Sequence, residues 1–216
     1  MSLALASSHA LHPLQIPGVW RGHQPAEQRA LPTGYADLDR LCPGGGLPVG
    51  AVTELLCERY GMGEFGLLMP CIARLTHEGK RVALVAPPYL PYAQGLAEEG
   101  VRLRQLVLLN PERGGDALWA AEQTLRSGSV DLVVAWPTRV NDRDLRRLQL
   151  AAEAGESTAV LYRPQRSAGL SSPAALRISV SPGLSSLKLS ILKSRGGQPR
   201  DLFLSSRFRQ TGTGWA

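Results

Sequence analysis

Short apolar runs alternate with helical patterns along most of this chain, and that alternation constrains the fold more than any other feature. Glycine or proline stands at the boundaries, as at Gly79, Pro87, Gly100 and Gly128. Strands that alternate with helices in this way predict a parallel α/β sheet. We expect strands at residues 51–56, 82–86, 106–109, 130–136 and 158–162. We expect helices at residues 35–41, with Thr33 as the N-cap, and at 65–78, 90–99, 115–127 and 142–154.

The last part of the pattern changes from alternation to consecutive strands. Strands are expected at residues 176–180, 187–192 and 201–204, and the turn-rich segment Lys193–Arg200 separates the last two. This arrangement predicts an antiparallel hairpin at the edge of the sheet. Residues 1–30, rich in Pro, His, Gln and Ala, indicate a flexible arm. The expected domain is therefore 31–204, followed by a basic tail at 205–216.

The first strand leads into a loop that has the layout of a phosphate-binding P-loop but lacks its charged groups. Such a loop needs glycines whose neighbouring N–H groups face phosphate, a Lys for the β- and γ-phosphates, and Ser or Thr for magnesium. The segment from Cys57 to Glu64 offers Gly61 and Gly63. Neither Lys nor Ser or Thr occurs between Cys57 and Leu75, and Glu64 would repel a triphosphate. The sequence therefore predicts no nucleotide cofactor and no catalysis at this loop.

Composition excludes several other classes of protein. The chain is 44% hydrophobic and 19% charged, which is ordinary for a globular protein, and no apolar run reaches the roughly 18 residues of a membrane span. No basic segment precedes an apolar core near Met1, so a secretory signal is not expected. The three cysteines, Cys42, Cys57 and Cys71, have no paired spacing. They indicate buried thiols in a reducing cytoplasm rather than disulfides or a metal site.

Positive charge is concentrated in the C-terminal part of the chain. Residues 157–216 contain nine basic residues and one acid, a net charge of +8, and the whole chain carries +6, so residues 1–156 carry −2. This asymmetry suggests an acidic partner, with nucleic acid the first candidate, although a solvated basic face would look the same. The residues that could contact DNA or a partner protein are Arg163, Arg166, Lys193, Arg195, Arg200, Arg207 and Arg209.

Several spaced motifs resemble the RecA ATPase core in the same order. They include Pro32-Thr33-Gly34, Gly45 to Gly50, Leu106 to Pro111 and Val130-Asp131. The resemblance covers residues 31–204 and implies a RecA-like fold. It also implies a magnesium-ordering Asp after Val134 and a general-base Glu near residues 87–88. Those positions hold Ala135-Trp136 and Pro87-Pro88, so three catalytic elements are missing together.

A second set of motifs is similar to the ImuA family of translesion-synthesis-associated proteins, which is related to the cell-division inhibitor SulA. The segments are Val19 to Gly22, Gly61 to Glu64, Ala86 to Ala93 and Asp116 to Gln123. The resemblance implies an SOS-induced accessory factor of error-prone DNA repair. Its implied partner is ImuB, a Y-family polymerase-like protein, with RecA and an error-prone polymerase III alpha subunit as further candidates.

Two alternatives stay open at the level of sequence. The loop Cys57–Glu64 could keep weak nucleotide contact through backbone N–H groups, or Glu64 could itself occupy the positive helix end and cap the loop. Arg163 and Arg166 follow the fifth strand, where a RecA-like protein carries a DNA-contacting loop, and they could face DNA, a partner protein or only solvent. We expect a non-catalytic protein-binding accessory factor, with a DNA-binding module or a SulA-like division inhibitor as alternatives.

Overall fold

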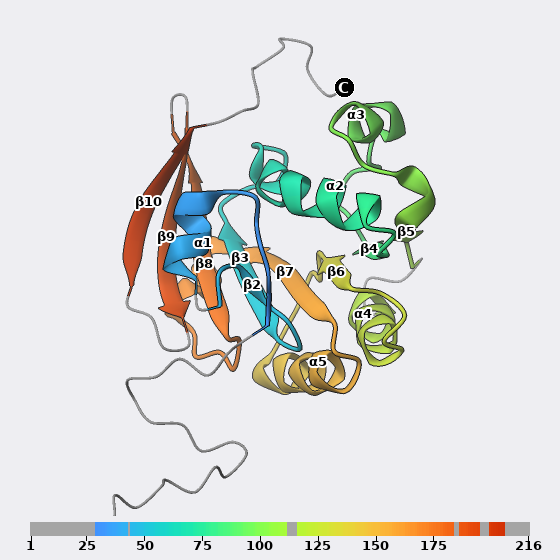
Figure 1. Cartoon of the computed structure of the whole chain (residues 1–216). Helices are drawn as coiled ribbons and strands as arrows, with labels where there is room; N and C mark the ends of the chain where they lie inside the picture. The colour runs from blue at the N-terminus through green and yellow to red at the C-terminus, as the bar shows by residue number, and fades with distance from the viewer. Residues whose placement is uncertain (1–28, 43, 112–115, 184–185, 195–198, 206–216) are drawn as a thin grey trace, which may run out of the picture.

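A twisted sheet of eight strands forms the centre of the molecule in a computed structural model that describes residues 29–42, 44–111, 116–183, 186–194 and 199–205 (Figure 1). The strand order across the sheet is β10-β9-β8-β3-β7-β6-β4-β5. The strands of this sheet are β3 (Val52–Cys57), β4 (Val82–Val85), β5 (Leu106–Leu109), β6 (Leu132–Ala135), β7 (Thr158–Pro164), β8 (Leu176–Pro182), β9 (Ser186–Ser194) and β10 (Arg200–Ser205). A separate two-stranded sheet joins β1 (Ala30–Leu31) to β2 (Leu47–Pro48).

The sheet is parallel from β8 through β5, and β9 and β10 are antiparallel additions at its edge. Parallel neighbours need crossover connections, which the helices between successive strands provide. The predicted fold class is therefore confirmed: a mostly parallel α/β sheet flanked by helices, with an antiparallel hairpin at one edge.

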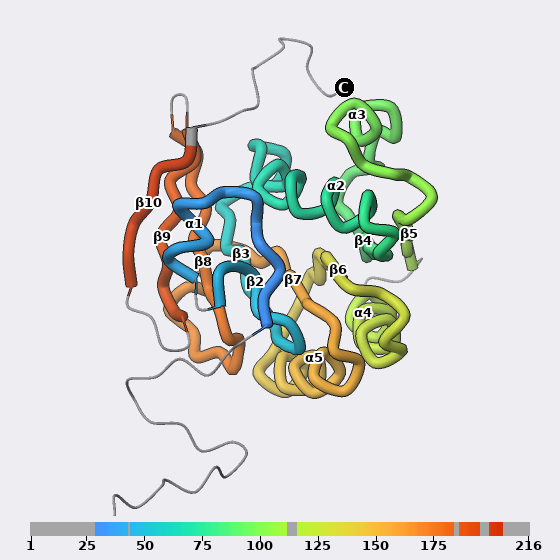
Figure 2. Tube along the Cα trace, in the orientation of Figure 1, coloured from blue at the N-terminus to red at the C-terminus, as the bar shows by residue number. Residues whose placement is uncertain are grey.

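Helices cover both faces of the sheet and enclose two apolar cores. The helices are α1 (Ala36–Leu41), η1 (Glu64–Leu68), α2 (Met69–His77), α3 (Ala93–Glu98), η2 (Leu103–Gln105), α4 (Asp116–Arg126), α5 (Asp142–Ala154) and η3 (Gln165–Gly169). Side chains of α1, α2 and α3 share one core with the sheet, and those of α4 and α5 share the other. Leu38 of α1 and Leu204 of β10 belong to the same core, and the tube in Figure 2 shows α1 lying beside the β8–β10 edge.

Several local predictions differ from the structure: the expected helix at residues 65–78 begins as the 3-10 helix η1, and two other differences concern helix starts. Helix α3 begins at Ala93 rather than Leu90, because Leu90 precedes Pro91 and that position disfavours helical backbone. Thr33 is not the N-cap of α1, since Tyr35 holds that position without a side-chain cap. The Thr33 hydroxyl instead donates a hydrogen bond to Asp39 at 2.7 Å. Helix α5, by contrast, has the predicted bounds.

The chain ends lie mostly outside the described residues. Residues 1–28 of the predicted arm and 206–216 of the predicted tail are among the segments that the structure does not describe. Arg29 is described, and its guanidinium donates to exposed Glu156 at 2.6 Å. Within the described part of the chain, none of the helices has the length and apolarity that crossing a membrane would require.

The start of α5 offers a test of local stability. Asn141 accepts a hydrogen bond from the Asp144 N–H, and the Asp144 carboxylate accepts one from the Asn141 N–H. We expect Asn141→Ala to lower the free energy of unfolding by about 1 kcal/mol, because a capped helix N–H loses its partner. Urea unfolding measures the change, and Arg143→Ala on the same turn is the control. Equal stability of both variants would contradict the capping role.

Candidate functional site

The loop after β3 has the strand–loop–helix geometry that its sequence predicts. β3 ends at Cys57, and the chain turns through Gly61 and Gly63 before η1 and α2. Gly61 and Gly63 have φ angles of 83° and 89°, a left-handed backbone conformation that side chains with a Cβ rarely adopt. The glycines are therefore needed for the shape of the loop, whatever the loop binds.

The carboxylate of Glu64 occupies the backbone donors of this loop. The N–H of Gly61 donates to Oε1 of Glu64 at 2.9 Å, and the N–H of Met62 donates to Oε2 at 2.8 Å. Glu64 is buried. An anion held by successive backbone N–H groups at the start of a helix is the arrangement that binds phosphate in a P-loop. Here the protein supplies the anion, and the prediction that Glu64 caps the loop is confirmed.

Aromatic rings fill the carboxyl ends of the strands beside the loop. Trp136, directly after β6, stacks on Tyr162 of β7 with ring centroids 4.9 Å apart and an interplanar angle of 7°. Phe65 meets the same indole edge-on at 5.6 Å. The hydroxyl of Tyr162 donates to the backbone carbonyl of Glu64 at 2.9 Å. An aromatic cluster thus stands where a magnesium-ordering carboxylate would follow β6, and the loop is tied to it.

Two weak acids beside the loop, the Cys57 thiol and the Tyr162 phenol, are held in their uncharged forms by raised pKa values. Burial, with a smaller contribution from the charge of Glu64, raises the pKa of the Cys57 thiol to about 12. Burial also raises the pKa of Tyr162 well above its ordinary value. Neither group is poised as a nucleophile or base near neutral pH. All three cysteines are free and buried, which confirms the prediction of buried thiols.

These residues do not fit a nucleoside triphosphate with magnesium. Two of the loop N–H groups are already bound by a carboxylate, and the same carboxylate would repel phosphate. After β4, the position of a general base holds Ala86 and two prolines; Ala86 has a φ of 50° and its N–H donates to the Leu109 carbonyl at 2.8 Å. No group of three or more His, Cys, Asp or Glu side chains that could hold a metal ion occurs among the described residues.

A buried ion cluster on the neighbouring strands was not anticipated from the sequence. Glu54 of β3 is fully buried and pairs with Arg163 of β7 and Arg177 of β8, the latter at 2.5 Å. Glu54 and Arg177 are register partners in the parallel β3–β8 pair. A Glu inside the apolar run Val52–Cys57 was the signal available in the sequence, because a buried carboxylate needs a partner.

The cluster also holds the loops that follow β6 and β7. Arg177 donates to the backbone carbonyls of Ser167, Ala168 and Leu170, at 2.7, 3.2 and 2.9 Å. Arg163 donates to the carbonyl of Val140 at 3.2 Å. The two arginines that pair with Glu54 therefore hold η3 and the turn before α5 in place.

None of the three alternatives considered for Arg163, contact with DNA, with a partner protein or only with solvent, is correct. Its side chain is buried against Glu54, because β7 continues to Pro164, past the expected end at residue 162, and Arg163 lies within the covered part of the strand. Arg166, three residues on, is exposed on η3. Lys193 and Arg200 are exposed near the β9–β10 turn, and the Lys193 ammonium donates to the Ser172 carbonyl at 2.7 Å. The remaining candidates, Arg195, Arg207 and Arg209, lie outside the described residues.

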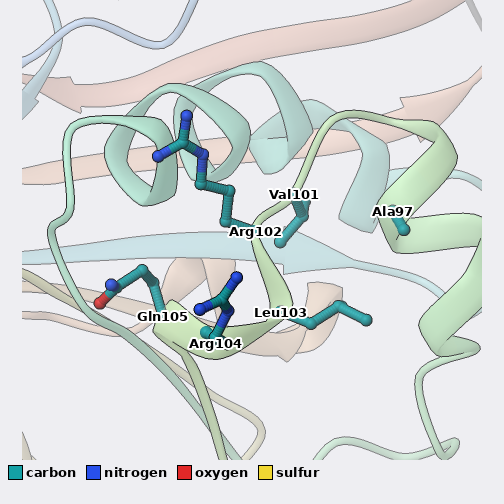
Figure 3. A pocket seen from close by; sticks show the side chains of 6 residues that line it. All are labelled: Ala97, Val101, Arg102, Leu103, Arg104 and Gln105. Carbon is teal, nitrogen blue, oxygen red and sulfur yellow. The ribbon is translucent and has the colours of Figure 1, made fainter.

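A surface hollow of about 540 Å³ lies away from the loop. Its lining comes from a single stretch of chain between α3 and β5, and Figure 3 shows the six side chains Ala97, Val101, Arg102, Leu103, Arg104 and Gln105. Since η2 leads into the amino end of β5, this hollow and the loop after β3 lie at opposite ends of the sheet. The hollow contains no carboxylate or nucleophile in its lining and does not form part of the candidate site.

Comparison with known proteins places this geometry in a family. A profile described as the RecA N-terminal domain matches residues 21–139, which is more than half of the chain and includes the loop, β6 and Trp136. The chain belongs to the RecA N-terminal domain family. Glu64, Phe65 and Trp136 lie within the matched residues, and Tyr162 lies beyond them.

Individual relatives fall into two groups. The cell division inhibitor SulA of Edwardsiella piscicida is 33% identical over 119 residues, covering 54% of this chain and 69% of SulA. Protein RecA of Chlorobaculum parvum is 38% identical over 112 residues, covering 49% of this chain but only 30% of RecA. A crystal structure of SulA from Pseudomonas aeruginosa matches 52% of this chain and 97% of that chain, with 23% identity and a TM-score of 0.45. The chain is thus RecA-like and SulA-related, and it spans about a third of the RecA proteins that it matches.

The loop capped by Glu64 leads to a prediction about nucleotide binding. We expect no binding of MgATP at millimolar concentration, because Glu64 already accepts the loop N–H bonds and repels phosphate. Calorimetric titration of the full chain measures this. A saturable, magnesium-dependent heat of ATP binding would contradict it.

The buried cluster leads to a prediction about stability. We expect Glu54→Ala to lower the free energy of unfolding by about 3–5 kcal/mol, because two buried guanidinium groups lose their counter-charge. Urea unfolding followed by circular dichroism measures the loss. Glu58→Ala, at an exposed position in the loop just after β3, is the control and should change stability by less than about 0.5 kcal/mol. A loss below about 1 kcal/mol at Glu54 would show that the cluster contributes little.

Proposed function

We propose that this protein is a non-catalytic RecA-fold scaffold that binds other proteins in the bacterial response to DNA damage. The observation that carries the proposal is the Glu64 cap, with its hydrogen bonds to Gly61 and Met62. In such a domain a glutamate side chain accepts the hydrogen bonds that the phosphate loop would otherwise donate to ATP. The domain then keeps a RecA-like surface but does not bind and hydrolyse ATP. Its function then resides in what the surface binds.

We further propose that the scaffold supports error-prone translesion DNA synthesis in the SOS response. The support is the resemblance to the ImuA family at Gly61 to Glu64, Ala86 to Ala93 and Asp116 to Gln123. Membership of the RecA N-terminal domain family is consistent with this reading. The partners proposed on this basis are ImuB and RecA, with the error-prone polymerase III alpha subunit reached through the same complex. The proposed place of action is the cytoplasm.

The second candidate function is inhibition of cell division. It is supported by the 33% identity to a protein named as the cell division inhibitor SulA, over 69% of that protein's length. A DNA-binding module is favoured less, because Arg163 is buried and paired with Glu54. Arg166, Lys193 and Arg200 are the described candidates that remain on the surface.

One pair of measurements separates these candidates. The full chain is titrated, by calorimetry or light scattering, with purified ImuB and with purified RecA from the same bacterium. We expect saturable binding to at least one of them, with no requirement for ATP. In parallel, the chain is overproduced in undamaged cells, where a scaffold leaves cell length unchanged. Binding to neither protein would contradict the scaffold proposal, and filamentation without DNA damage would establish the SulA-like alternative instead.

A further inference from the structure

Strand β10 forms one edge of the eight-stranded sheet, at the left in Figure 1, and pairs on one side only. Its sheet partner among the described residues is β9, so the backbone N–H and C=O groups on its other side have no ladder partner there. Natural sheets protect such edges with proline, bulges, short strands or charges, because an open edge is a template for another strand. β10 has six residues, contains no proline and pairs with β9 without a register shift. Charge is therefore the one protection of this edge.

The strand is held in place from both faces. Leu204 is buried in the core that includes α1, and half-buried Leu202 packs against the same core. On the opposite face Phe203 is 65% exposed, and the Lys188 ammonium of β9 lies 6.0 Å from the centroid of its ring. The same ammonium pairs with the Asp201 carboxylate at 2.9 Å. An edge ordered in advance loses less conformational entropy when it binds.

The strands at this edge carry positive charge. β8, β9 and β10 together contain four basic residues and a single acid. One of the four, Arg177, is buried and paired with Glu54. Arg200 is exposed and takes part in no ion pair within the described part of the chain. The charges that reach the surface, three positive and one negative, give a sum of +2 and belong to Lys188, Lys193, Arg200 and Asp201.

Two elements packed near these strands contribute little charge of their own. Helix α1 carries two acids and one arginine: Asp37 pairs with Arg40, and Asp39 accepts two hydrogen bonds from the segment before the helix. The loop after β3 lines a small hollow together with residues of β8 and β9, and its exposed Glu58 and Arg59 have opposite charges. At the surface these two elements contribute −1 in total.

Helix η3 and the buried groups restore the positive charge. The Ser179 hydroxyl of β8 donates to Gln165 of η3 at 3.0 Å, and the next residue, exposed Arg166, adds a positive charge in a helix without acids. Below the surface, the carboxylate of Glu64 is offset by the buried cluster in which two arginines share Glu54. The described surroundings of β10 therefore keep a positive charge.

This charge disfavours the occupants that the chain itself could supply. A second copy would place an identical positive edge against β10, and like charges on paired strands are destabilising. The adjoining segments add Arg195 between β9 and β10, and Arg207 and Arg209 after β10, without an acid. Residues 1–28 contain one Arg and one Glu, so they offer no net negative charge. The backbone of another strand matches an open edge, and acidic side chains match a positive one, which points to another protein.

We propose that the open edge of β10 takes up an acidic extended segment of a partner protein as an additional strand of the sheet. This inference rests on the proposed scaffold function and assigns that function to one edge of the molecule. The backbone of the added strand pairs with β10, an apolar side chain of the partner covers Phe203, and an Asp or Glu meets the Arg200 guanidinium.

The first test needs no substitution in the chain. Amide hydrogen exchange is measured on the full chain, alone and with whichever purified protein binds it in the titration described above. Amides of residues 200–205 whose N–H groups point away from β9 should exchange about tenfold or more slowly in the complex, because they gain an inter-strand hydrogen bond. Unchanged exchange along β10 in the complex would overturn the proposal.

Substitutions at exposed positions test the side-chain contacts. Phe203→Ala should weaken binding by about tenfold or more, because an interface aromatic is removed. Arg200→Glu should weaken binding by about tenfold or more and make it less sensitive to salt, because the edge loses the charge that meets an acid. The matched controls are Leu150→Ala and Arg146→Glu at exposed positions of α5, which should bind within about threefold of the unchanged chain.

The outcomes separate this inference from the function on which it rests. If the unchanged chain binds neither purified protein, the scaffold function fails and the docking edge fails with it. If the chain binds while β10 gains no protection and both variants bind within about threefold of it, the docking edge is overturned and the scaffold function stands. Protection of β10 by a single-stranded oligonucleotide, with none by the protein, would overturn the docking edge in favour of nucleic acid.

Discussion

The carboxylate of Glu64 determines what the rest of this domain can do. It accepts the N–H groups of Gly61 and Met62, which in a phosphate loop would be directed at a ligand. The backbone of Glu64 in turn accepts the hydroxyl of Tyr162, whose ring stacks on Trp136. One residue therefore joins the loop after β3 to the strand ends of β6 and β7. The end of the sheet that would bind nucleotide is closed by the protein's own side chains.

The buried ion cluster around Glu54 holds the neighbouring loops in place. Glu54 lies in the centre of the sheet with Arg163 and Arg177, and the two guanidinium groups reach backbone carbonyls of η3 and of Val140. Buried ion clusters of this kind often add little net stability, but removing one partner is costly, so they fix geometry. Loops that follow β6 and β7 are thus held in one arrangement. A surface with one fixed arrangement of loops suits the proposed role, in which other proteins bind to this domain.

The sequence predicted the main elements but not where some of the charges lie. The bounds of α5 and the order of strands and helices follow from hydrophobic periodicity and from Gly and Pro at the boundaries. Arg163 was misplaced because the strand was expected to end at residue 162, whereas β7 continues to Pro164 and both of its faces are covered. The pairing of Glu54 with Arg177 depends on strand register across more than a hundred residues, which periodicity does not give. The absence of Lys from the loop was visible in the sequence, whereas the aromatic cluster around Trp136 needed the fold.

The central claim is that Glu64 occupies the loop amides and leaves no site for a nucleotide. The most direct measurement follows the backbone amide resonances of Gly61 and Met62 by nuclear magnetic resonance while MgATP is added to the folded chain. The structure predicts that both resonances stay unchanged up to millimolar MgATP, because both N–H groups already donate to the carboxylate. A saturable shift of either resonance would contradict the claim and restore a nucleotide-dependent role.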